Sequence, residues 1–226
     1  NYKVSVYLFN IHNKLSDDCA ANKQRLIDSK RVGHFTEVTL NFDPPELTED
    51  MVVIDGLFGS GLNKPLIGGF ASLVKYINQC PAKVVSIDIP SGLMCEDNTY
   101  NIHSNIIRAD LTLTLQQKKL SMMMADCQKY IGRLRVLDIR LSKEYIDKTE
   151  ANCRILEEQD VRRLLMPRDD FAHKGSMGNA LRIDRSYRMA GSAVLATRTC
   201  LRSCVGNLTV HTPNHNHLVM QTAAHD

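Results

Sequence analysis

Apolar and polar positions alternate along the chain with two different periods. Short, nearly continuous apolar runs rich in Val, Ile and Leu predict strands at 4–9, 51–55, 84–88, 109–115 and 134–139. Apolar residues three or four positions apart predict helices at 17–27, where Ser16 or Asp17 can cap the first turn, and at 70–78. Apolar strands separated by helices are typical of a parallel sheet covered on both faces. We therefore predict an α/β fold.

Two of the predicted strands end in an aspartate that small residues follow. Asp55 precedes a stretch with three glycines, and Asp88 precedes Ile-Pro-Ser-Gly, in which the serine is Ser91. Ligands of open parallel sheets bind at the carboxyl ends of the strands, and glycine allows the backbone to approach them closely. These carboxylates and the Ser91 hydroxyl could hold a hard cation or exchange protons. They could equally cap the turns that follow the strands, and the pattern leaves both readings open.

Composition narrows the class of protein. The chain has 226 residues, of which 43% are hydrophobic and 23% charged, which indicates a folded globular protein. Its length allows one large domain or two small ones. No apolar run reaches the roughly 18–20 residues that cross a bilayer, so we expect no membrane partner. A scattered net charge of +3 gives no basic patch, so we expect no nucleic-acid partner.

Cysteines and lysines suggest two further expectations. Seven cysteines without a Cys-x-x-Cys pair, and no signal-peptide pattern, predict reduced thiols in a cytoplasmic protein. The adjacent Lys118 and Lys119 are expected to lie on a solvated face.

The two strand-end segments together resemble a known family. Residues 54–62 read I-D-G-L-F-G-S-G-L and residues 87–93 read I-D-I-P-S-G-L. They are similar to V-D-A-L-F-G-T-G-L and V-D-I-P-S-G-L of the NAD(P)H-hydrate epimerases, the YjeF N-terminal domain family. Residues 15–18 and 108–114 agree as well, so the resemblance covers about residues 2–142. It implies a Rossmann-like three-layer α/β sheet, here lacking the first strand of the family.

A second resemblance begins near residue 165. Residues 173–178, 189–193 and 209–213 look like the opening of the ADP/ATP-dependent NAD(P)H-hydrate dehydratases, which have a ribokinase-like α/β fold. We therefore expect an incomplete epimerase domain at 1–143, a connector at 144–164 and the start of a dehydratase domain at 165–226. This order is that of bifunctional repair enzymes.

The resemblance implies repair of damaged nicotinamide nucleotides. Epimerases of this family interconvert the R and S hydrates of NADH and NADPH at C6, and the dehydratase returns the S form to NAD(P)H with ADP or ATP. The expected substrates are thus NADHX and NADPHX, and the expected cofactors are a potassium ion and, for the dehydratase half, ADP or ATP. The family also makes a homodimer an expectation.

Individual roles follow by matching the motifs. The resemblance gives Asp55 and Ser91 as potassium ligands, and Asp88 as both a substrate contact and the acid–base residue, although the roles of the two aspartates could be exchanged. It gives Ser192 as a substrate contact in the dehydratase half. The expected dinucleotide-binding loop consists of Gly59, Ser60, Gly61, Leu62, Asn63, Lys64 and Pro65.

The chain also departs from both families. It has no N-G-G-D-G loop, which in epimerases cradles phosphates and supplies a potassium ligand, and no G-T-G-D motif of the dehydratases. Asp184, Arg185 and Arg188 stand where the dehydratases have small residues. We therefore expect turnover by this polypeptide to be impaired, at or near the spontaneous rate. A non-catalytic nucleotide-binding or interaction module remains the alternative, whereas an oxidoreductase is disfavoured because no strand is followed by G-x-G-x-x-G.

Overall fold

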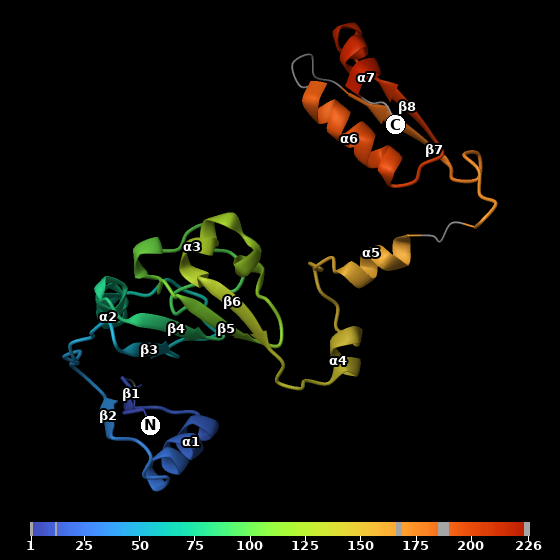
Figure 1. Ribbon diagram of the computed structural model, residues 1–226. Coiled ribbons are helices and arrows are strands. Elements are labelled where there is room, and N and C mark those ends of the chain that lie inside the picture. The colour runs from blue at the N-terminus through green and yellow to red at the C-terminus, as the bar shows by residue number, and fades with distance from the viewer. Residues whose placement is uncertain (1, 12, 166–168, 185–189, 224–226) are drawn as a thin grey trace. The chain divides into compact units, whose positions relative to one another are not determined.

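The computed structural model describes residues 2–11, 13–165, 169–184 and 190–223 (Figure 1). All paired strands are parallel and alternate with helices, so the α/β prediction is confirmed. The chain divides into two compact units, residues 1–153 and 154–226. The division falls within the segment 144–164 that the sequence predicts as a connector. None of the described helices is long and apolar enough to cross a membrane.

A four-stranded sheet forms the centre of the first unit. Its strands follow the order of the chain: β3 (Val52–Asp55), β4 (Lys83–Ile87), β5 (Leu111–Leu115) and β6 (Arg133–Leu137). Each had been predicted to within two residues at either end. Because all four run the same way, their carboxyl ends lie at one edge, and the register sets Asp55 beside Ser86.

The N-terminal strands form a separate sheet. Strand β1 (Ser5–Phe9) pairs in parallel with β2 (His34–Val38), and α1 (Asp17–Asp28) connects them. The Ser16 hydroxyl accepts a hydrogen bond from the Cys19 N–H at 3.2 Å, as expected of an N-cap. Strand β2 was not predicted, because the sequence His-Phe-Thr-Glu-Val lacks a continuous apolar run.

Aromatic side chains link this small sheet to the rest of the unit. Phe42, in the loop after β2, packs edge-on against Tyr7 and Phe9, with ring centroids 5.2 and 5.0 Å apart. Phe9 also lies 6.0 Å from Phe70 of α2 (Gly68–Gln79), and Phe70 lies 5.0 Å from Phe58. Such pairs contribute beyond the area that they bury. Side-chain packing, with no strand pairing among the described residues, therefore joins the two sheets.

Two apolar clusters stabilise the larger sheet. In the first, Val74 and Ile77 of α2 pack with Val84, Ile107 and Ala109. The second fills the space beneath the short helices η1 (His103–Asn105), η2 (Leu120–Met123), η3 (Ala125–Cys127) and α3 (Gln128–Ile131). Its members are Ile89, Leu93, Ile106, Met122, Cys127, Tyr130 and Ile131.

The expectation that helices cover the sheet on both faces is wrong at its edges. Val52 and Ile54 of β3 are 57% and 61% exposed, and Val136 and Leu137 of β6 are 44% and 40% exposed. The buried positions concentrate on β4 and β5, because α2 and the short helices pack over the central strands. Within this sheet, β4 and β5 come nearest to being buried on both faces, as apolar parallel strands usually are.

The second unit is smaller and also α/β. It contains α5 (Glu158–Leu164), the parallel pair β7 (Asn179–Ile183) and β8 (Asn207–His211), and α6 (Ala190–Arg202) between them, followed by η4 (Asn214–Asn216) and α7 (His217–Ala223). Ala193, Val194 and Met220 form its core. The segment α4 (Lys143–Lys148) precedes this unit along the chain. A ribokinase-like fold for the complete domain stays a prediction.

The core assignment can be tested by truncating one isoleucine. Ile107 is fully buried between α2 and the sheet, so Ile107→Ala should lower the free energy of unfolding by about 2–5 kcal/mol. Ile139→Ala, at a side chain 46% exposed, should change it by less than about 0.5 kcal/mol. Urea unfolding followed by circular dichroism measures both, since the chain has no tryptophan. Equal losses in the two variants would contradict the assignment.

Candidate functional site

Asp55 lies at the end of β3 and is almost completely buried, with 2% of its surface exposed. Its carboxylate accepts the Ser86 hydroxyl at 2.7 Å, the Ser91 N–H at 2.9 Å and the Ser91 hydroxyl at 2.5 Å. It also accepts the Leu57 N–H at 3.4 Å. The Ser91 oxygen in turn accepts the Phe58 N–H at 3.0 Å. Asp55 and Ser91 thus fasten the loops after β3 and β4 to each other.

The donor atoms around Asp55 suit a potassium ion. The Asp55 carboxylate, the Ser91 hydroxyl and the Phe58 carbonyl, 3.5 Å from the Ser91 oxygen, are all oxygen ligands, which hard cations prefer. The chain already satisfies Asp55 by hydrogen bonds, so an ion at Oδ1 would have to share that oxygen with the Ser91 hydroxyl and with the Leu57 N–H, whose bond is the longest. The residues therefore fit such an ion chemically, and their role as its ligands stays a prediction.

Asp88 lies directly after β4 in a left-handed backbone conformation, with φ of 68°. Aspartate tolerates this conformation better than most residues with a Cβ. Its N–H donates to the Leu113 carbonyl of β5 at 2.8 Å, which fixes the turn. The side chain is 13% exposed, and its Oδ2 accepts the Ser60 N–H at 3.2 Å. The structure thus brings Asp88 to the predicted dinucleotide-binding loop.

That loop, residues 59–65, is largely open. Gly59, Ser60, Gly61, Asn63 and Lys64 are exposed, whereas Leu62 and Pro65 are half-buried. A Cβ on Gly59 would lie 3.5 Å from Asp88 Oδ2, and one on Gly61 would meet nothing within 4 Å. The backbone of this loop is therefore free to approach a ligand.

The expectation that Lys119 lies on a solvated face is wrong. Its side chain is only 14% exposed, and its Nζ donates to Asp88 Oδ1 at 2.5 Å. Lys118 is exposed, as expected. Adjacent charges suggested one solvated face, but the turn after β5 directs the two side chains differently. A usable signal did exist: Lys119 follows β5 closely, and the ends of β4 and β5 share an edge of the sheet.

Cys95 is a second residue that the sequence did not single out. Its thiol donates to the Ser60 carbonyl at 3.5 Å, so it is bonded to the predicted dinucleotide-binding loop. Burial raises the pKa of Cys95, and the negative charge of Asp88 raises it further. The thiol therefore remains a neutral donor.

Four residues of the second unit that the sequence singled out lie in or near the undescribed segment 185–189. Ser192 lies in the first turn of α6, where its carbonyl accepts a bond from Arg182 at 3.3 Å. Asp184 forms an ion pair with the same arginine at 3.3 Å. Arg185 and Arg188 lie outside the described residues. The predicted nucleotide contacts of this half therefore stay predictions.

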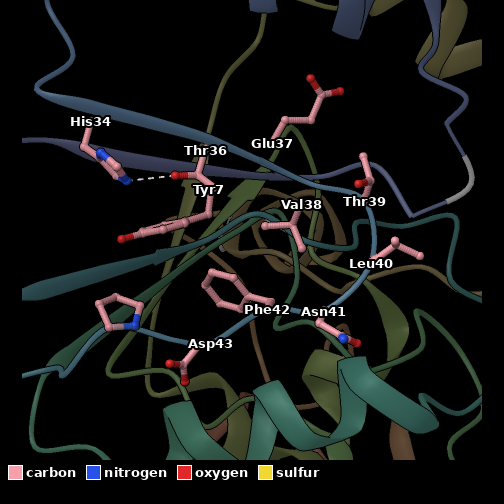
Figure 2. Close-up of a pocket in the computed structure, with 11 residues that line it drawn as sticks. Tyr7, His34, Thr36, Glu37, Val38, Thr39, Leu40, Asn41, Phe42 and Asp43 are labelled. Atoms are coloured by element: carbon pink, nitrogen blue, oxygen red, sulfur yellow. Dashed lines mark hydrogen bonds between the residues drawn. The ribbon is translucent and has the colours of Figure 1, made fainter.

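The two prominent cavities lie away from Asp55 and Asp88. One of about 420 Å³ is bordered by Tyr7, His34 and the loop after β2. Figure 2 shows the His34 ring hydrogen-bonded to the Thr36 hydroxyl of the same strand, and the two atoms lie 2.8 Å apart. The other, of about 760 Å³, lies against α2 beside Phe70 and Leu73. Neither of these two cavities is bordered by a predicted site residue.

Comparison with known proteins agrees with this geometry. The family described as "YjeF-related protein N-terminus" matches residues 1–121, which include both strand-end motifs. The chain belongs to this family. The resemblance drawn from the two motifs is confirmed.

Curated relatives are similar to the chain over different shares of its length. A bifunctional NAD(P)H-hydrate repair enzyme Nnr of Coxiella burnetii is 32% identical over 177 residues, covering 78% of this chain and 36% of that protein. The Nnr enzyme of Thermofilum pendens is 30% identical over 204 residues, covering 88% and 37%. An NAD(P)H-hydrate epimerase of Limosilactobacillus fermentum is 32% identical over 104 residues, covering 46% and 49%.

The lengths of these alignments carry two facts. The chain spans about a third of the length of the bifunctional relatives that it matches. The alignment with the Thermofilum enzyme is longer than the first unit, so the similarity continues into the second unit.

Replacing Asp55 tests its buried network. Asp55→Asn puts an amide N–H₂ against the donors of Ser86 and Ser91, so we expect a loss of about 1–3 kcal/mol in the free energy of unfolding. Asp147→Asn is the matched control, because Asp147 is exposed in α4 and forms no hydrogen bond through its side chain among the described residues. Thermal unfolding in sodium buffer measures both. An unchanged transition for Asp55→Asn would show that the network contributes nothing.

Proposed function

We propose that the chain is part of an NAD(P)H-hydrate repair protein, and that its first unit binds the hydrated dinucleotide whose R and S forms the protein interconverts at C6. One observation carries this proposal. The Asp88 carboxylate, at the end of β4, has its Oδ2 turned to the exposed glycine-containing loop 59–65. The family and the names of the relatives support the substrate class.

The chain's own residues divide the work of binding and proton transfer. The loop of Gly59 to Pro65 offers the dinucleotide backbone N–H groups such as that of Gly61, where an added Cβ would meet no atom within 4 Å. Asp88 acts as the acid–base residue: its carboxyl gives a proton to the C6 hydroxyl, which leaves as water with the electrons of the C6–O bond while the ring nitrogen stabilises the cation, and its carboxylate takes a proton back from the water that adds again at C6. Loss from one face and return to the other changes R into S.

Asp55 and Ser91 would hold the potassium ion. Such an ion supplies a fixed positive charge beside the bound dinucleotide. Because Asp55 is buried and bonded to both loops, it positions Ser91 and the Phe58 backbone with or without the ion. We therefore assign proton transfer to Asp88 and potassium binding to Asp55.

For the second unit the proposal names the type of domain and one residue, without a mechanism. The similarity that continues into it supports the start of a dehydratase, which would use ADP or ATP, with Ser192 among the substrate contacts. The segment before Ser192, residues 185–189, is outside the described part of the chain, so no step is derived there. A cytoplasmic location and a homodimer remain part of the proposal.

Binding of NADPHX to the 226-residue chain is the decisive measurement. We expect calorimetry to show binding in potassium that weakens about tenfold in sodium at equal ionic strength, because the oxygens of Asp55 and Ser91 would hold the ion. Absence of binding in both salts would contradict the proposal. Equal binding in the two salts would contradict the ion site alone.

Turnover separates the enzyme from a binding module. Pure R hydrate is supplied with a separate dehydratase that consumes only the S form, and NADPH formation is followed. The sequence leads us to expect a rate at or near the spontaneous one. Conversion clearly above that rate would overturn this expectation and establish the chain as an epimerase. Binding without conversion would favour the non-catalytic module.

A methyl group tests the approach of the ligand to the loop. Gly61→Ala meets no atom within 4 Å, so it should leave the thermal unfolding transition unchanged. The added methyl lies where the dinucleotide would approach the backbone, and we expect about tenfold weaker binding of NADPHX. Gly69→Ala, equally unhindered but in α2, is the control and should bind normally. Normal binding by Gly61→Ala would show that the ligand does not approach the backbone of this loop.

A further inference from the structure

The two oxygens of Asp88 have different surroundings. Oδ1 accepts the Lys119 ammonium at 2.5 Å and the Leu115 N–H at 3.3 Å. Within the described part of the chain, Oδ2 accepts only the Ser60 N–H, at 3.2 Å. A carboxylate can accept about four hydrogen bonds. Oδ2 therefore keeps an acceptor position on the side of the dinucleotide-binding loop, whereas Oδ1 is occupied.

Lys119 is itself firmly held. Besides Asp88, its Nζ lies 2.9 Å from the Thr114 hydroxyl, 3.1 Å from the Leu115 carbonyl and 3.2 Å from the Gln117 carbonyl. An ammonium has three N–H groups, so these four acceptors use all of them. Lys119 cannot turn to a ligand without breaking bonds that it makes to the turn after β5. Any effect that it has on a ligand passes through Asp88.

We propose that Lys119 is a positioning residue of the candidate site: it fixes Asp88 through Oδ1, so that Oδ2 faces loop 59–65 and the hydrated dinucleotide bound there. This inference rests on the proposed function. The ion pair sits at a mostly buried position, where charge-assisted bonds hold a fixed geometry well.

The other ionisable groups nearby do not replace Lys119. Cys95 lies under Ser60, and its raised pKa, caused by burial and then by Asp88, keeps it neutral. Glu96 and Lys119 also act electrostatically on Cys95, and Glu96 carries the same sign as Asp88. Lys118 is exposed and forms no hydrogen bond through its side chain among the described residues. Lys119 thus supplies the positive charge at Asp88.

A purely structural role would give a different result. In that case Lys119 would only fasten the turn after β5, and its loss would weaken ligand binding regardless of what stands at position 88. Positioning instead requires that the effect of Lys119 vanish once Asp88 has lost its charge. A double-mutant cycle distinguishes the two roles.

The cycle uses the full 226-residue chain and calorimetry with NADPHX. We expect Lys119→Ala to weaken binding about tenfold and Lys118→Ala, the matched control, to bind like the parent. In an Asp88→Asn background, Lys119→Ala should change the affinity by less than about twofold. Lys119→Gln keeps a donor for Thr114 without the charge, and should also weaken binding; it replaces the alanine variant if that one does not fold.

Three results would overturn the inference. Parent-like binding by Lys119→Ala and Lys119→Gln would show that the lysine does not matter to the ligand. An effect of the same size in the Asp88→Asn background would assign Lys119 to the turn alone. If the parent chain itself does not bind NADPHX, the proposed function fails and the inference fails with it, which distinguishes that case from the first two.

Discussion

The loops at the carboxyl edge of the large sheet depend on one buried carboxylate. An ionisable group with 2% exposure is tolerated only where hydrogen bonds replace its contacts with water. Asp55 receives such bonds from β4, from Ser91 in the following loop and from its own loop at Leu57. The two motifs that identify the family are therefore one structural unit. If either loop moved, hydrogen bonds between the buried Asp55 carboxylate and Ser91 would break.

The backbone after Ser91 is constrained in the same region. Gly92 has φ of 96°, and a Cβ there would lie 2.2 Å from the Asn105 carbonyl oxygen. Only glycine allows this contact, which presses the loop against η1. The Asn101 amide also donates to the Gly92 carbonyl at 2.8 Å. The sequence suggested that the small residues after both strands let a ligand approach. At Gly92 the lack of a side chain instead allows close packing, whereas a Cβ on Gly61 would meet no atom within 4 Å.

Features that depend on local sequence patterns could be predicted, whereas features that depend on contacts between distant residues could not. Strands β3 to β6 and helix α2 follow from local apolar periods, and the pairing of motifs at Asp55 and Asp88 follows from parallel strands ending at one edge. Strand β2 was missed because its residues are mixed in polarity and become a strand only by pairing with β1. Lys119 was misjudged because its ion-pair partner, Asp88, lies 31 residues away along the chain at the end of another strand. Tertiary contacts of that kind leave no period in the sequence.

The environments of the two aspartates bear on a question that the sequence left open. Their roles could be exchanged on motif grounds, since each ends a strand before small residues. Asp55 is buried and its bonds come from both loops, whereas Asp88 is 13% exposed and keeps an acceptor position on Oδ2. A group that transfers protons must reach the substrate, and a group that holds a loop or an ion need not. This difference supports Asp88 as the group that transfers the proton and Asp55 as the group that holds the loops, and Lys119 occupies Oδ1 of Asp88, so that Oδ2 is the oxygen on the side of the loop.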